Sequence, residues 1–279
     1  MDLDGWLNFF REVGSRLRKE VLSISGQPEA RREIRRGAGG DTTTFIDQRA
    51  EGVILDQLLR LQGKGENFTL ISEELGWKEF GTGGLNLLVD PVDGSLNAKK
   101  GVPFFSTSLA LIEGKELSGT KLGFVINLAN GDEFWAWRGG GSFFNGRRLQ
   151  ASHSDRMEIL AFEANSPAND LSAILPLLPH VIRTRCLGST ALDLCYTACG
   201  FIDLFLIPHS SRGFDFAAGK LILEEARGII TDSQGKDLGD LPIDLQRKTS
   251  LLASGSGKVH RQALNILRGG WKSKAGEIH

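Results

Sequence analysis

Apolar residues recur at helical spacing in two segments near the N-terminus. In residues 3–25 they lie three or four positions apart, and charged residues occupy the opposite face. The same spacing returns over residues 46–61. This period predicts two amphipathic helices. Between them, residues 27–43 contain Pro28 and three glycines, so we predict an irregular loop there.

The next part of the chain favours strands. Its apolar runs are short and are bounded by turn residues, many of them glycine. The runs are residues 68–72, 85–89, 104–112, 120–128 and 132–138. After them, Asn145-Gly146 is a strong hairpin signal. We therefore predict a mostly antiparallel sheet behind the two helices, in an α+β lobe that covers residues 1–154.

The rhythm changes after residue 155, where short apolar runs alternate with helical patterns. Predicted strands are residues 157–164, 180–185, 202–207 and 228–232, and predicted helices are residues 172–178, 190–199 and 216–226. Alternation of this kind predicts an α/β lobe, here over residues 155–279. The predicted fold class is therefore α/β in the broad sense, with an α+β lobe followed by an α/β lobe.

Composition narrows the classes of partner. The chain has 279 residues, 41% of them hydrophobic, and a formal net charge of −1, so its charge gives no reason to expect nucleic-acid binding. No apolar run approaches the ~18 residues of a membrane span, and the N-terminus lacks the pattern of a signal peptide. We therefore expect a cytoplasmic protein without a membrane partner. The three cysteines are expected to be structural thiols.

Two aspartates end the apolar run at residues 87–89. Asp90 and Asp93 lie three positions apart, with Pro91 between them and Gly94 after them. Taken alone, such a sequence is most often a simple turn. Carboxylates held this close repel each other, however, unless a cation lies between them, and Mg²⁺ is the common cation that prefers oxygen ligands.

Other acids follow other predicted elements. Glu73 and Glu74 end the apolar run before them, and Asp215 stands at the head of a predicted helix. Aspartate at that place is also an ordinary capping residue. Three such positions, each carrying acids, predict a cluster that converges on a metal ion.

Three segments resemble the signature sequences of the inositol monophosphatase family. They are ISEELG at residues 71–76, LLVDPVDGSLN at 87–97 and FDFAAGKLILEEARGIITD at 214–232. The chain is most similar to the branch, typical of archaea, that also hydrolyses fructose 1,6-bisphosphate. The resemblance implies a layered α-β-α-β-α sandwich with the active site where two lobes meet. It also implies a homodimer, which is common in the family.

The resemblance further implies a site for two or three Mg²⁺ ions. By similarity, one ion would bind Glu73, Asp90 and the carbonyl oxygen of Val92. A second would bind Asp90, Asp93 and Asp215, and a third, weaker ion would also use Glu73.

The catalytic residues implied by the resemblance are Asp47, Glu73 and Ser95. Asp47 and Ser95 match the acid and the hydroxyl residue that position the attacking water. Most inositol monophosphatases have threonine where this chain has Ser95. Without the resemblance, Asp47 would be interpreted as a solvated acid in the first turn of the second helix.

The substrate contacts implied in the same way are Asp93, Gly94, Ser95, Arg185, Gly188, Ser189, Thr190 and Arg212. The amides of Gly94 and Ser95 would hold the phosphate. Animal relatives place a glutamate shortly before the last metal aspartate, whereas this chain has no acid between Leu206 and Phe214. Arg212 in that stretch suits a second phosphate. The alternative is that Arg212 pairs with a carboxylate and supports the loop.

Two further charged groups have simpler interpretations. Lys220 and Glu224 lie one helical turn apart and are expected to form a pair at the surface. The arginines at positions 31, 32, 35 and 36 are expected mainly to form a solvated face.

Together these features predict a Mg²⁺-dependent phosphatase of small sugar or cyclitol phosphate monoesters, such as inositol 1-phosphate or fructose 1,6-bisphosphate. A metal-activated water would attack phosphorus directly. One alternative is a phosphatase of 3′-phosphoadenosine 5′-phosphate, although nothing in the sequence points to an adenine pocket. Another is a non-catalytic regulatory protein with this fold, which would be expected to have lost one of the site residues.

Overall fold

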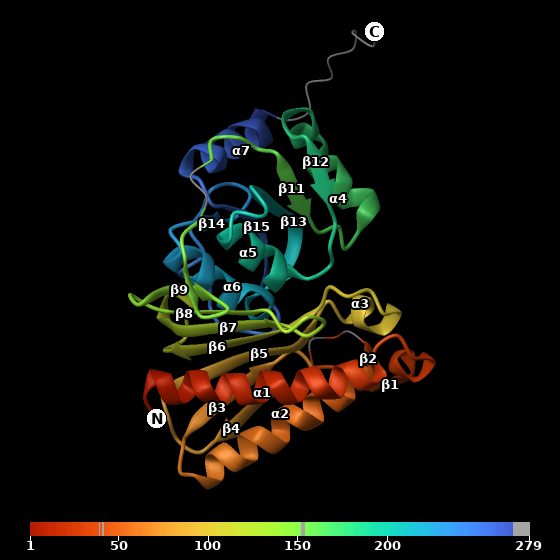
Figure 1. Ribbon diagram of the computed structural model, residues 1–279, viewed down its shortest axis with the longest axis vertical. Helices are drawn as coiled ribbons and strands as arrows, with labels where there is room; N and C mark the ends of the chain where they lie inside the picture. The colour runs from red at the N-terminus through yellow and green to blue at the C-terminus, as the bar shows by residue number, and fades with distance from the viewer. Residues whose placement is uncertain (39, 41, 152–153, 270–279) are drawn as a thin grey trace.

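The protein is built of alternating helical and sheet layers. The computed structural model describes residues 1–38, 40, 42–151 and 154–269. From one end to the other, Figure 1 shows a helical layer, a sheet, a second helical layer, a second sheet and outer helices. The predicted α-β-α-β-α sandwich and the α/β class are confirmed. Within the described residues, no helix is both long and apolar enough to cross a membrane.

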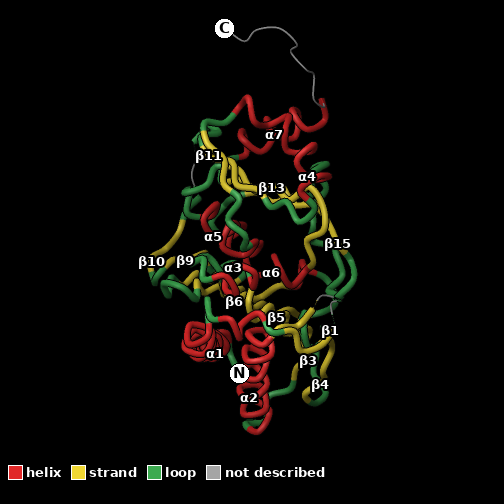
Figure 2. Tube along the Cα trace, turned by 90° about the vertical axis from the view of Figure 1, so that its right-hand side faces the viewer, coloured by secondary structure: helices red, strands yellow, loops and turns green. Residues whose placement is uncertain are grey.

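Two long helices form the first layer, as predicted. They are α1 (Leu3–Ile24) and α2 (Phe45–Gly63), and they lie side by side beneath the first sheet in both views (Figures 1 and 2). The Asp2 carboxylate begins α1 by accepting a hydrogen bond of 2.8 Å from the Gly5 amide. The apolar faces of both helices are buried, because the sheet removes these stripes from water.

The segment between these helices is more ordered than predicted. It contains a short 3₁₀ helix (Pro28–Arg31) and a hairpin of β1 (Glu33–Arg36) and β2 (Thr42–Thr44). The expectation of an irregular loop was wrong here because the strand β1 is nearly all polar and gives no apolar period. Tertiary contacts hold it instead, including an ion pair of 2.6 Å between Arg35 and Glu51.

The first sheet has eight strands in the order β10-β9-β8-β7-β6-β5-β3-β4. Its strands are β3 (Phe68–Ser72), β4 (Gly76–Phe80), β5 (Leu85–Asp93), β6 (Ser106–Glu113), β7 (Thr120–Asn127), β8 (Glu133–Trp137), β9 (Gly141–Phe144) and β10 (Arg147–Leu149). Only β3 and β5 pair in parallel, so the predicted antiparallel character is confirmed. Asn145 and Gly146 have φ angles of 47° and 76°, which form the predicted hairpin turn. Two short helices, α3 (Ser95–Lys100) and a 3₁₀ turn (Leu117–Gly119), follow strands of this sheet.

The second sheet has five strands in the order β12-β11-β13-β15-β14. They are β11 (Ile159–Phe162), β12 (Arg183–Arg185), β13 (Leu204–Arg212), β14 (Ile229–Thr231) and β15 (Lys248–Ser254). The helices are α4 (Pro167–Ile174), a 3₁₀ helix (Leu175–His180), α5 (Thr190–Ala198), α6 (Gly213–Glu225) and α7 (Gly257–Gly269). The sequence patterns predicted neither β15 nor α7.

Helices α5 and α6 form the middle layer, between the two sheets (Figure 2). One hydrophobic cluster joins this layer to both sheets and includes Phe134, Phe205 and Phe214. The proposed lobe boundary near residue 154 therefore remains a prediction, because the core continues across it.

The middle layer also explains a wrong prediction. Lys220 was expected at the surface, but it is only 4% exposed, because α6 is enclosed between the two sheets. The Lys220 ammonium lies 2.5 Å from the Glu224 carboxylate, which is half-buried and also contacts Arg138 at 3.1 Å. Lys220 and Glu224 therefore form the predicted pair, but the lysine charge is buried and does not lie at the surface.

Packing of α6 on the first sheet requires glycine at position 123. A Cβ atom there would lie 2.7 Å from the Ala218 carbonyl oxygen, so we expect Gly123→Ala to lower the free energy of unfolding by about 1–3 kcal/mol. A methyl group at Gly52 in α2 would have no atom within 4 Å, so Gly52→Ala is expected to raise it by up to about 1 kcal/mol. Urea unfolding of both variants measures the difference, and equal midpoints would contradict this account.

Candidate active site

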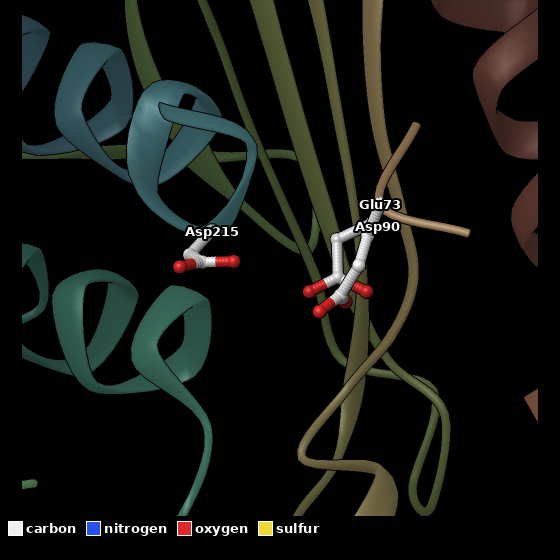
Figure 3. A group of neighbouring side chains, drawn as sticks. All are labelled: Glu73, Asp90 and Asp215. Carbon is white, nitrogen blue, oxygen red and sulfur yellow. The ribbon is translucent and has the colours of Figure 1, made fainter. Parts of the chain in front are cut away.

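Three carboxylates from separate segments point toward a common place (Figure 3). Glu73 follows β3, Asp90 lies in β5, and Asp215 lies in the first turn of α6. Each offers one oxygen atom, and these atoms all lie within 4.8 Å of one another. The predicted convergence of these three acids therefore occurs in the folded chain.

The electrostatics of this cluster favour a cation. Burial raises the pKa of Asp90 well above its usual value, and the charges of Glu73 and other acidic neighbours add to the shift. Burial also raises the pKa of Asp215 to about 7, although the nearby Arg212 charge opposes that shift. A divalent ion among oxygen ligands relieves both the repulsion and the desolvation. The donor set fits Mg²⁺, whose preferred ligands are carboxylate and carbonyl oxygens.

The turn after Asp90 is held tightly. The Asp90 carboxylate accepts a hydrogen bond of 3.0 Å from the Val92 amide. Gly94 has a φ angle of 84°, a left-handed conformation that favours glycine. A Cβ atom at Gly94 would also lie 2.6 Å from the Gly188 carbonyl oxygen. The glycine thus lets the chain after β5 approach the turn that carries Gly188.

Asp93 connects this turn to the start of α5. Its Oδ2 atom accepts hydrogen bonds of 2.5 Å from the Ser189 hydroxyl and 2.8 Å from the Ala191 amide, at the start of α5. Burial raises the pKa of Asp93 to about 6, and these hydrogen bonds oppose the shift. Asp93 lies outside the three-acid group defined above, so its role as a metal ligand remains a prediction.

Arg212 lies against the acidic cluster. Its guanidinium pairs with the Glu73 carboxylate and lies 4.8 Å from the centre of the Phe214 ring. Its backbone amide donates a hydrogen bond of 2.7 Å to Asp215. This arrangement favours the alternative in which Arg212 pairs with a carboxylate, while a substrate contact by Arg212 remains a prediction.

The predicted catalytic pair lines a small cavity on one side of the cluster. This cavity has a volume of about 160 Å³ and is lined by Asp47, Ser95, Glu73 and Asp90, among others. Asp47 is buried, and it accepts hydrogen bonds of 2.8 Å and 2.6 Å from the amide and hydroxyl of Thr44. Asp47 is therefore held by a capping box and is not the solvated acid that the sequence alone suggested.

Comparison with known proteins identifies the family. The sequence profile of the inositol monophosphatase family matches residues 3–270.

This chain belongs to the inositol monophosphatase family.

A fructose-1,6-bisphosphatase/inositol-1-monophosphatase of Methanothermobacter thermautotrophicus is 32% identical over 277 residues, which cover 95% of this chain and 98% of that protein. A bifunctional NADP phosphatase/NAD kinase of Methanococcus maripaludis is 30% identical over 285 residues, covering 94% of this chain but 49% of that protein. A solved structure from Pyrococcus horikoshii, described as similar to inositol-1 monophosphatase, has a TM-score of 0.81 at 25% identity and covers 95% of this chain and 99% of that one. The predicted family and enzyme class, a phosphatase, are confirmed.

In this member of the family, a larger cleft lies on the other side of the acidic cluster. It has a volume of about 510 Å³, and the predicted substrate residues Gly94, Ser95, Gly188, Thr190 and Arg212 are among those that line it. Ser189 is buried beneath this lining and holds Asp93. Arg185 is exposed on β12, where its guanidinium donates a hydrogen bond of 2.8 Å to the Thr184 carbonyl oxygen. It is absent from the lining, among the residues that the structure describes.

Three charged residues of these cavities were missed by the sequence analysis. Lys99 lines the small cavity, and Lys248 and Glu163 line the cleft. Glu163 accepts a hydrogen bond of 2.7 Å from the Gly188 amide, and burial raises its pKa to about 7. No local motif marks these residues. Only the position of Lys99, four residues after Ser95 on one helix, could have indicated a shared face.

Titration of the buried acids predicts how pH and metal act on stability. The pKa values of Asp90, Asp93 and Asp215 are raised in the folded chain, while unfolded aspartate titrates near ~3.9. In the presence of a chelator, the free energy of unfolding should therefore fall as the pH rises from about 4 to about 7. Saturating Mg²⁺ should remove this fall, because it stabilises the ionised carboxylates. Thermal melting across this range tests it, and parallel curves with and without Mg²⁺ would contradict it.

Proposed function

We propose that this chain is a Mg²⁺-dependent phosphatase that hydrolyses small sugar or cyclitol phosphate monoesters. The observation that carries the proposal is the convergence of Glu73, Asp90 and Asp215 beside a cleft of suitable size. A cleft of about 510 Å³ lies within the usual range for small-ligand sites. The non-catalytic alternative is disfavoured, since no predicted metal or water-positioning residue is missing from the chain.

The proposed metal ligands follow the sequence prediction. Glu73, Asp90 and the Val92 carbonyl oxygen would hold one Mg²⁺, and Asp90, Asp93 and Asp215 a second. When bound, the metal supplies charge neutralisation of the phosphate and a lower pKa for a coordinated water. Two ions per chain are proposed, with a third, weaker ion that shares the same acids.

The remaining steps belong to side chains and amides of this chain. Asp47 accepts a hydrogen bond from the attacking water, and the Ser95 hydroxyl orients it. Gly94 and Ser95 follow Asp93 in the turn and line the cleft, and their amides bind the phosphate oxygens. Glu73 contributes through the metal. Fixed positions of this kind lower the barrier because water and phosphate meet already oriented.

Asp90→Asn tests the metal-dependent mechanism. The change keeps the side-chain volume but removes the buried anion between Glu73 and Asp215, so we expect kcat to fall by at least about a thousandfold. Without metal, the variant should be more stable than wild type, because repulsion is relieved. Asp56→Asn, at an exposed site on α2, is the control and should leave kcat unchanged. Phosphate release at saturating Mg²⁺ measures both, and retention of more than a tenth of wild-type turnover by Asp90→Asn would refute the role.

We infer a substrate with a second anionic group. Relatives named as fructose-1,6-bisphosphatase/inositol-1-monophosphatase suggest fructose 1,6-bisphosphate and inositol 1-phosphate as the first compounds to assay. The Methanococcus maripaludis relative adds NADP to the panel, and 3′-phosphoadenosine 5′-phosphate tests the remaining alternative. Initial rates for these four compounds at fixed Mg²⁺ rank them.

Lys248 is the cation best placed for that second group. It begins β15 directly opposite Arg212 of β13, and directly opposed residues of antiparallel strands project to the same face. Both residues line the cleft. Arg212 is paired with Glu73, whereas Lys248 is exposed and forms no ion pair with a described residue.

Lys248→Met should therefore act selectively. We expect kcat/KM for fructose 1,6-bisphosphate to fall by the equivalent of about 1.5–3 kcal/mol, the value of a hydrogen bond to a charged group, while inositol 1-phosphate is little affected. Arg212→Met should slow both substrates alike if its main partner is Glu73, and the bisphosphate more if it contacts substrate as the sequence suggested. Lys236→Met, at another exposed lysine, is the matched control. Equal losses on both substrates for Lys248→Met would reject its assignment.

We further propose that the protein is a homodimer located in the cytoplasm. Both follow from the family resemblance and the sequence, and sedimentation equilibrium tests the dimer.

A further inference from the structure

The small cavity contains a cation that the proposed mechanism does not use. Lys99 lies in the last turn of α3, and its ammonium nitrogen is 3.7 Å from Asp47 Oδ2. Its side chain is 15% exposed, so most of it is withdrawn from water. Glu73, Glu74 and Asp90 line the same cavity. A lysine is thus held among the acids on one side of the proposed metal site.

The helix geometry directs this lysine inward. Lys99 lies four residues after Ser95, which places both side chains on one face of α3, and Ser95 also lines the cavity. The next residue, Lys100, is exposed and is not part of the lining. A favourable interaction with the helix dipole would explain a lysine at either position. It would not explain why the charge of Lys99 lies beside Asp47.

The charges around the small cavity determine what the ammonium group of Lys99 does there. Asp47 and Glu73 contribute carboxyl groups to its lining, while burial raises the pKa of Glu74, whose carboxyl accepts a hydrogen bond from Thr43. A fixed ammonium group neutralises part of this field without any metal. It also repels a divalent cation that enters the same space, since like charges at short range in a poorly hydrated site interact strongly.

We propose that Lys99 is the counterion of the acids that line the small cavity. Its charge weakens the binding of a divalent ion between Asp47 and Glu73 and so limits how many ions the site holds. This inference rests on the proposed Mg²⁺-dependent function and concerns its metal stoichiometry. Lys99 is a positioning and charge-balancing residue in this account, because it acts on the metal and on Asp47 and does not contact the substrate.

Isothermal titration of Mg²⁺ into chelator-treated protein tests the inference without relying on activity. Lys99→Met removes the charge with little change of volume. We expect its weakest ion to bind about tenfold more tightly than in wild type, or one more ion to bind per chain. Lys100→Met removes the same charge just outside the cavity and should titrate like wild type. Lys99→Arg retains the charge and should also titrate like wild type.

Melting curves supply a second measurement. Without metal, Lys99→Met should melt at a lower temperature than Lys100→Met, because the cavity acids have lost their counterion, and Mg²⁺ should close the gap. Identical titrations of Lys99→Met, Lys100→Met and a wild type that binds Mg²⁺ would overturn this inference alone. If none of the proteins binds Mg²⁺, the proposed function and this inference are both rejected.

Discussion

Mutual repulsion of buried carboxylates is the constraint on which the structure of this site depends. Two unit charges 4.8 Å apart, the upper limit for the ligand oxygens of this cluster, repel by about 3.5 kcal/mol at the effective dielectric constant of ~20 that describes protein sites. A whole domain is stable by only about 5–15 kcal/mol, so a cluster of ionised acids consumes a large part of that stability. The fold withstands this because Asp90 and Asp215 lie on β5 and α6, two largely buried elements. Strong packing elsewhere thus maintains a site that is unfavourable without a cation.

The chain counters the repulsion with its own groups. Arg212 pairs with Glu73, and Lys99 lies beside Asp47. Asp93 is held by the hydroxyl and amide groups that begin α5. These contacts join segments far apart in sequence, so the site is also where the two sheets are connected. In α5, burial and the charge of the neighbouring Glu163 raise the pKa of Asp193 well above its usual value.

Local sequence patterns predicted the helices and strands whose apolar residues recur with a regular period. Helices α1 and α2 and strand β3 were located to within two residues, because their apolar periods are regular and their ends carry turn residues. Strand β1 was not predicted because its residues are nearly all polar. Lys220 was wrongly predicted at the surface because the sequence of α6 alone does not show that a second sheet covers it. The resemblance identified Glu73, Asp90 and Asp215 correctly as neighbours. It did not show that Lys99 and Lys248 enter the cavities, since side-chain direction depends on tertiary packing.

The two cavities on either side of the acidic cluster suggest how the reaction is arranged in space. The smaller one, about 160 Å³, has room for several waters but is below the size of ordinary ligand sites. The larger one has a volume within the usual range for small-ligand sites, and Gly188 and Lys248 belong only to its lining. Ser95, Glu73 and Asp90 border both. Water held by Asp47 and a phosphate ester in the cleft would therefore reach the proposed metal site from different cavities. In-line displacement at phosphorus requires the nucleophile to enter opposite the leaving group, and separate places for the water and the ester are compatible with that requirement.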